Sequence, residues 1–118
     1  MKYICLCYDE EEKFKAMSKP EWDSLMREVY VYTEELRQKG TLLISQALQS
    51  VETSTTVRVR DGKVSTTDGP SAETKEQLGG FFLIEASDLN DAIRVASRLP
   101  GARLGCIEVR PARTLPIP

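Results

Sequence analysis

Two short segments of this chain, residues 2–8 and 81–85, are apolar on both of the faces that a β-strand presents. In the first segment, Tyr3 and Cys5 share one face, and Ile4 lies on the other. A strand with this pattern is covered on both sides by other parts of a folded protein. The two segments therefore predict interior strands of a sheet, and the rest of the chain must account for the covering of both faces.

A long amphipathic helix is predicted over residues 19–39. Ser18 and Glu21 have the spacing of a capping box, in which each side chain accepts a hydrogen bond from the other residue's backbone N–H. Gly40 supplies a stop at the other end. The apolar stripe between them consists of Trp22, Leu25, Met26, Val29, Thr33 and Leu36.

A second amphipathic helix follows the strand at 81–85. Its N-cap is Ser87 or Asp88, and Pro100-Gly101 closes it. Further strands are predicted at 42–48 and at 105–110.

The region between these elements contains a hairpin. Asp61-Gly62 is a strong signal for a two-residue turn, which places Val59 opposite Val64. The segment 68–80 that follows is too polar for a core element, so we predict an ordered loop or a short helical turn there.

The order strand, helix, strand, hairpin, strand, helix, strand predicts an α+β fold with the ferredoxin-like split β-α-β pattern and an inserted β-hairpin. At 118 residues, the chain 1–118 is expected to form a single domain. Two helices cover only one face of such a sheet, although 3–8 and 81–85 are apolar on both. We therefore expect a homodimer joined through the helix-free face of the sheet. Because both faces of these strands are apolar, the sequence does not tell which set of side chains points toward the partner.

Composition excludes several classes of partner. A net charge of -2 provides no basic field for nucleic acid, and no apolar stretch approaches the length of a membrane span. Acidic residues 9–12 follow the first strand, unlike a secretory signal. Cys5, Cys7 and Cys106 form an odd set that fits a reducing compartment. We expect a cytoplasmic protein with free thiols and no nucleic-acid or membrane partner.

Nearly the whole chain resembles a known family. DGKVSTTDGPSAETKEQLGGFFLIEASDLNDAIRVASRLPGARLGCIEVRP, with MKYICLCY and YTEELRQKG before it, resembles the DGPF branch of the YCII-related family. The resemblance implies a dimeric α/β barrel, in which two ferredoxin-like sheets pack face to face. Ser71 stands where the branch usually has Phe. The His-Asp pair suspected to be catalytic in the YCII branch has no counterpart, because the chain contains no His.

Asp68 is the leading candidate for a catalytic acid or base. The Gly-Pro after it restricts the backbone and could hold the carboxylate at the mouth of a dimer cleft; the alternative is an Asx-turn residue that caps its own loop. Glu73 and Lys75, with Glu76, could orient a small polar ligand, or could be solvated loop charges.

Four strand residues, Tyr3, Tyr8, Ser45 and Gln46, could fix a ligand between two sheets through hydroxyl and amide groups. Packed core side chains are the alternative. The three thiols could approach one another, since the first and last strands pair in such folds. They lack a fourth ligand and knuckle spacing, so we predict buried small side chains and no metal.

Two hypotheses for function remain open. The first is a cofactor-free enzyme that acts on a small organic molecule in an intersheet cleft, with Asp68 transferring a proton. The second is a ligand-binding or regulatory module without turnover; relatives encoded near alternative sigma factors suggest a role beside transcription. No serine or cysteine relay with His, P-loop or dinucleotide fingerprint is present in the sequence.

Overall fold

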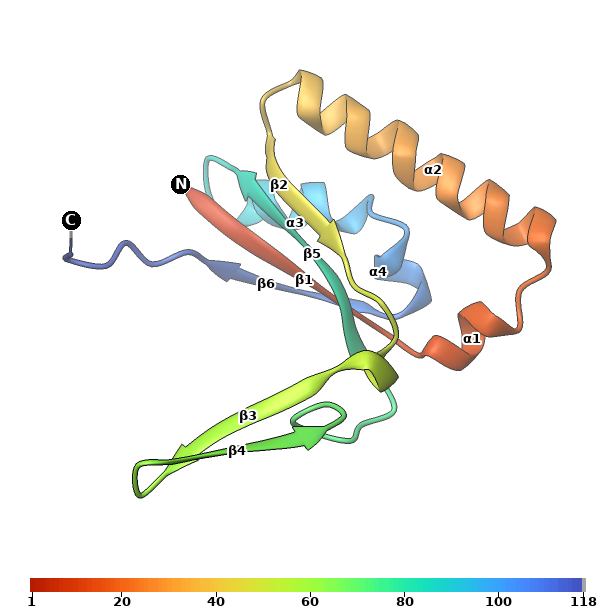
Figure 1. The fold of residues 1–118 in the computed structure, drawn as a ribbon. Coiled ribbons are helices and arrows are strands. Elements are labelled where there is room, and N and C mark those ends of the chain that lie inside the picture. Colours follow the sequence, from red (N-terminus) through yellow and green to blue (C-terminus); the bar gives the residue numbers. More distant parts are fainter. Residues whose placement is uncertain (118) are drawn as a thin grey trace.

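The computed structural model describes residues 1–117 and contains one four-stranded antiparallel sheet, a two-stranded arm and helices on one side (Figure 1). The elements in chain order are β1 (Lys2–Asp9), α1 (Glu11–Lys15), α2 (Lys19–Gln38), β2 (Leu42–Ala47), η1 (Val51–Thr53), β3 (Thr55–Arg60), β4 (Lys63–Asp68), β5 (Gln77–Glu85), α3 (Leu89–Ser97), α4 (Gly101–Leu104) and β6 (Cys106–Pro111).

The strand order β2-β5-β1-β6 gives the sheet a ferredoxin-like topology, as the order of elements predicted. The two strands predicted to be interior, β1 and β5, lie side by side in the middle of the sheet. The capping box at the start of α2 is present, with both of its hydrogen bonds at 3.3 Å.

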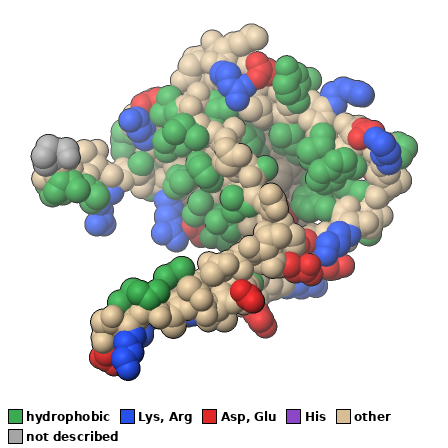
Figure 2. Space-filling model, in the orientation of Figure 1, with side chains coloured by type: hydrophobic (Ala, Val, Ile, Leu, Met, Phe, Trp, Pro, Cys, Tyr) green, Lys and Arg blue, Asp and Glu red, His purple; other side chains and the backbone are tan. Residues whose placement is uncertain are grey.

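The structure decides which face of each central strand the helices cover. Tyr3 and Cys5 of β1 pair with Ile84 and Phe82 of β5, and the first three of these side chains are buried in the core with residues of α2 and α3. The opposite face carries Ile4, Leu6, Phe81 and Leu83, with Ile44 of β2, and no helix of the described chain packs on it. We call these five side chains the open face. Figure 2 shows hydrophobic side chains gathered over the sheet, seen from the side away from α3 and α4.

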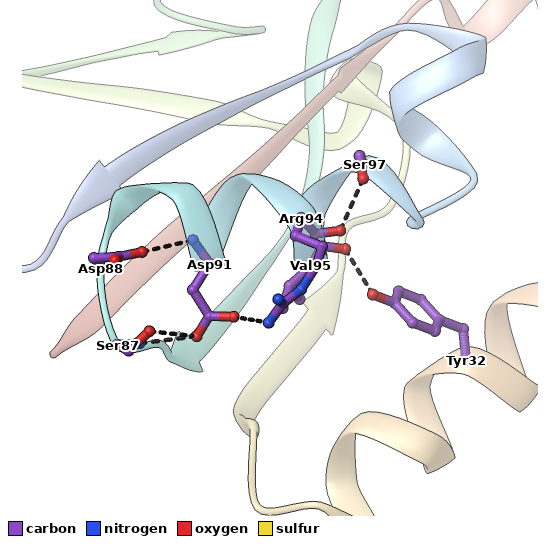
Figure 3. A network of polar contacts seen from close by, with 7 residues as sticks. All are labelled: Tyr32, Ser87, Asp88, Asp91, Arg94, Val95 and Ser97. Carbon is purple, nitrogen blue, oxygen red and sulfur yellow. Dashed lines mark hydrogen bonds and ion pairs between the residues drawn. The ribbon is translucent and has the colours of Figure 1, made fainter.

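A buried polar contact joins the two main helices (Figure 3). The Tyr32 hydroxyl of α2 donates a 2.7 Å hydrogen bond to the Val95 carbonyl of α3, and the Arg98 guanidinium lies 4.4 Å from the centre of the Tyr32 ring. Asp88, one of the two predicted caps, accepts a 2.8 Å bond from the Asp91 N–H at the start of α3. The contacts of Tyr32 with Val95 and Arg98 therefore join α2 to α3 and the residue after it.

The predicted hairpin forms with the predicted pairing, Val59 opposite Val64. Asp61 and Gly62 at its turn have φ of 52° and 73°, the left-handed values that an Asp-Gly turn supplies. The arm projects away from the body of the molecule instead of extending the main sheet (Figure 1). Its valines are exposed, Val64 by 70%.

Three boundary predictions were wrong. β5 begins at Gln77, so Gly79 and Gly80 lie inside a strand and not in a loop over 68–80. Pro100 is the N-cap of the short helix α4, because proline is compatible with a helix start. The acidic segment after β1 includes the short helix α1 instead of only ending the strand.

Within residues 1–117, no helix has the length and apolar character needed to cross a membrane.

Candidate functional site

A cavity of about 480 Å³ lies on the helix side of the sheet, between α2 and the end of the sheet where β1 and β2 finish and β5 begins. We call it the α2 pocket. Its walls are mainly apolar, including Phe14, Leu25, Met26, Val29, Phe82 and Leu104. The polar side chains that line it include Cys7, Asp9, Thr33, Glu34, Arg37 and Ser45. The volume and the few polar groups in an apolar wall are typical of a small-molecule site.

Asp9 lies at the end of β1, beside an irregularity in the pairing of β1 with β5. The pairing with β5 shifts by one residue between Cys7 and Tyr8, and the extra residue on β5 is Gly79. A Cβ atom on Gly79 would lie 2.6 Å from the Asp9 Oδ2 atom, so the carboxylate occupies space that only glycine leaves free. Gly79 therefore allows Asp9 to lie against the strand at the edge of the pocket.

The surroundings of Asp9 raise the pKa of its carboxyl group. Burial raises the pKa of the Asp9 carboxyl above its ordinary value, and the nearby acidic side chains of Glu11 and Glu76 raise it further. A carboxylate with a raised pKa is a stronger base when ionised and holds a proton closer to neutral pH. Asp9 can accept a proton from a bound molecule or return one to it.

Cys7 lies beside Asp9 in the pocket and is a poor nucleophile. Burial, with smaller effects from Cys5, Asp9 and Cys106, raises the pKa of the Cys7 thiol to about 12. Because the thiolate is the reactive form, the neutral thiol provides packing and not attack at neutral pH.

The other polar side chains described here line the pocket from α2 and β2. Ser45 pairs with Phe82 and so projects from the helix side of the sheet. Thr33 donates a 2.6 Å hydrogen bond to the Val29 carbonyl, within its own helix. Arg37 forms an ion pair with Glu34 one turn earlier.

The segment after Asp9 is hydrogen-bonded to the connection between β2 and the arm. The Glu11 carboxylate accepts a 2.7 Å bond from the Val51 N–H and a 2.8 Å bond from the Ser50 hydroxyl, both in the connection between β2 and the arm. These hydrogen bonds hold the pKa of Glu11 below its ordinary value. They anchor α1, which contributes Phe14 to the pocket wall.

The residues predicted from the sequence are dispersed. Asp68 is exposed at the end of β4, on the arm, and lines neither the α2 pocket nor the second depression described below. Ser45 lines the α2 pocket, with Gln46 at its border. Tyr3 is only 3% exposed and belongs to the core, where its hydroxyl lies 3.8 Å from the Met1 sulfur.

A second, shallower surface depression contains two of the predicted loop residues, Lys75 and Glu76. Lys75 lines it with Tyr8 of β1, and its Nζ atom lies 3.8 Å from a Glu10 carboxylate oxygen. Glu73 is exposed in the preceding loop and does not line it. Lys75 therefore pairs with Glu10, and not with its sequence neighbours.

The three sulfurs do not meet on one face. Cys106 lies opposite Tyr8 in the β1–β6 pairing, whereas Cys5 and Cys7 project from the other face of β1. Cys5 is buried, Cys7 is partly buried and Cys106 is exposed, so the prediction of three buried thiols was wrong for Cys106. Within residues 1–117, no group of three His, Cys, Asp or Glu side chains is arranged to hold a metal ion.

Sequence reasoning missed Asp9 because it treated residues 9–12 only as the end of a strand. Two signals pointed to it. Asp9 continues the alternation of Cys5 and Cys7, which lie on the helix-covered face of β1. The pair Gly79-Gly80 precedes an apolar strand, where glycine often marks a bulge or a close approach.

Comparisons with known proteins agree with the fold. Residues 1–115 match the model of the YCII-related domain. An uncharacterised protein of Rhizobium meliloti (strain 1021) is 37% identical over 113 residues, which cover 94% of this chain and 91% of that protein.

A solved structure of similar fold is that of 5-chloro-2-hydroxyhydroquinone dehydrochlorinase (TftG) from Burkholderia phenoliruptrix AC1100, in complex with 2,5-dihydroxybenzoquinone. The TM-score is 0.56 at 13% identity, over 96% of this chain and 94% of the other. At this identity the likeness shows the fold alone. Assignment to the DGPF branch rests on the sequence resemblance alone and stays a prediction. The match over nearly the full length shows that this chain belongs to the YCII-related domain family.

Proposed function

We propose that this protein is an enzyme that performs acid–base chemistry on a small organic molecule in the α2 pocket, with Asp9 as the proton-transfer residue. The observation that carries the proposal is a carboxylate with a raised pKa at the edge of a largely apolar cavity. A carboxyl group in a cleft whose pKa is raised by burial and by neighbouring charges is a candidate for a catalytic acid or base.

The pocket can support a proton transfer with the chain's own groups. Asp9 removes a proton from the bound molecule, and the Ser45 hydroxyl can donate a hydrogen bond to the negative charge that develops. The apolar wall lowers the local dielectric constant and so strengthens both interactions. A protein of similar fold is named as a dehydrochlorinase of a small hydroxylated ring, which supports a small organic molecule as the substrate class.

Asp68 is the second candidate for the acid or base. It is exposed in the single chain, so it would need a second copy of the chain to bury it and raise its pKa. The two aspartates are separated by comparing Asp9→Asn and Asp68→Asn.

The experiment begins with a thermal-shift screen of small organic molecules and follows each hit by mass spectrometry for conversion. We expect Asp9→Asn to bind a converted hit within a few-fold of the wild type and to lose at least about 100-fold in turnover, the usual contribution of a general base. Asp68→Asn should keep its turnover. The reverse pattern would transfer the role to Asp68 and reject Asp9.

A ligand-binding or regulatory module is the alternative function, and one observation favours it. The pocket thiol is held neutral, and the described residues contain no hydroxyl or thiol paired with a histidine base. Hits that bind with micromolar affinity and are never converted by the wild type would favour this module, including a role beside transcription.

The protein is also proposed to form a homodimer through the open face. Leu6, Phe81 and Leu83 present apolar surface there, and Ile44 beside them is 56% exposed. Monomeric proteins rarely leave more than a few hundred Å² of contiguous apolar surface in water. Pairing two such sheets would bury an interface on the order of 1,600 Å² or more.

Light scattering after size exclusion tests this assembly. We expect a mass near twice the 13.2 kDa of one chain, and a shift toward the single-chain mass for Leu83→Glu. The matched control is Val64→Glu on the arm, which should keep the dimer. A folded wild-type monomer at micromolar concentration would refute the open face as an interface.

A further inference from the structure

Among the charged side chains that line the α2 pocket, the cation is already paired and a carboxylate is left to face a ligand. Arg37 is the one cationic side chain among the described residues that line it, and its guanidinium is already paired with Glu34. Asp9 is the remaining charged group, and the two charged side chains that raise its pKa, Glu11 and Glu76, are also acidic. A negatively charged ligand would thus meet a carboxylate with no free cation to balance it.

The walls add a second restriction. Phe14 and Phe82 come from α1 and β5, and Leu25 and Val29 from α2, so apolar groups line the pocket from several elements. The Phe14 ring is held edge-on to Trp22, with 5.9 Å between the ring centres. Moving an ion into such surroundings without a partner is strongly unfavourable, whereas an apolar ring is favoured.

We infer that the α2 pocket selects an uncharged, ring-sized molecule that presents a hydroxyl hydrogen-bond donor to Asp9, and that it rejects carboxylates and phosphates of the same size. The inference deepens the proposed function and rests on it for the identity of the site. Selective binding can be measured whether or not the bound molecule is converted.

A matched pair of probes tests the selection. At pH 7.5, 4-hydroxybenzyl alcohol is neutral and 4-hydroxybenzoate carries a carboxylate on the same ring. Calorimetry should show the alcohol binding at least about 10-fold more tightly, a difference of about 1.4 kcal/mol. In ¹⁵N-labelled protein, the alcohol should shift amide signals of Cys7, Asp9 and Ser45.

Asp9→Asn should narrow the difference between the two probes to less than about threefold, because the repelling charge is gone. Glu12→Gln is the control, since it makes the same change in net charge at an exposed position outside the pocket. It should leave the difference unchanged. Equal or tighter binding of the benzoate to the wild type, or no binding of the alcohol at millimolar concentration, would overturn the inference.

Failure of this inference is distinguishable from failure of the proposed function. Selection for the neutral probe without conversion of any hit would uphold the inference and reject the enzyme. Conversion that depends on Asp9 but acts on anions would uphold the enzyme and reject the inference.

Discussion

Replacing Gly79 by alanine should displace the Asp9 carboxylate without unfolding the sheet. The backbone of Gly79 does not have a positive φ, so alanine can adopt its conformation. The obstacle is the side chain of Asp9, because the new Cβ would lie 2.6 Å from Oδ2, 3.3 Å from Cγ and 3.4 Å from Oδ1.

The size of the displacement follows from these distances. Ordinary contact begins at 3.4 Å, so the Oδ2 atom must move away by about 0.8 Å (3.4 − 2.6). A shift of this size in a catalytic group can lower turnover by about 100-fold. A carboxylate can rotate into the open pocket, and alanine is more favourable than glycine in a strand. We therefore expect the free energy of unfolding to change by less than about 1 kcal/mol.

The assay requires no substrate. In ¹³C-labelled protein the Asp9 carboxyl can be titrated by NMR, and its pKa should be raised in the wild type and lower in Gly79→Ala, because the displaced group is better solvated. Gly101→Ala is a matched control on the same pocket, since its Cβ would meet only the Ile107 Cδ1 atom, at 3.9 Å. An unchanged Asp9 titration in Gly79→Ala would refute the proposed contact.

Three further predictions concern the remaining titratable groups. Asp68→Asn should leave the melting temperature and the binding of 4-hydroxybenzyl alcohol unchanged, because Asp68 is exposed and outside the pocket; a tenfold loss of affinity would contradict this. Glu11→Gln should lower the free energy of unfolding at pH 7 by about 0.5–1 kcal/mol, measured by urea unfolding. The variant lacks the charge of the carboxylate that accepts the hydrogen bond from the Val51 N–H, at a partly solvated site. The pKa of Glu11 is lower in the folded state than in the unfolded state. The extra stability is therefore present above the unfolded-state pKa of roughly 4.3 and is lost as the pH falls through the folded-state pKa. A stability difference between wild type and variant that persists at pH 2 would contradict this prediction. Iodoacetamide at pH 7.5 should modify Cys106 first and leave Cys5 unmodified until the protein unfolds. Cys5 is buried, and burial raises the pKa of its thiol to about 11. Early modification of Cys5, detected by mass spectrometry, would contradict this prediction.

Local patterns were enough to predict the six strands and the two longer helices, α2 and α3. The capping box at Ser18 and Glu21 and the turn at Asp61-Gly62 depend on residues a few positions apart, and both form as predicted. The stripe predicted for α2 is buried only in part, since Trp22 and Met26 are exposed and Tyr32, outside the stripe, belongs to the core. Their order limited the topology to the ferredoxin-like arrangement, since connections in that pattern leave few alternatives.

The faces of the central strands required the tertiary structure. Tyr3 and Ile4 are both apolar, so neither composition nor alternation distinguishes the side that α2 and α3 cover from the open face. The packing of the helices makes that choice, and it places Tyr3 in the core instead of in a binding cleft.

The candidate site was hidden from the sequence for a related reason. Asp9 and Gly79 are 70 positions apart (79 − 9), and their contact exists only because β1 and β5 pair with a one-residue shift. The raised pKa of Asp9 arises from burial and from neighbours that the fold brings together. Sequence alone determined which segments form the strands and the two longer helices, because those depend on near neighbours. The pairing of distant segments decided which carboxylate lies beside a pocket.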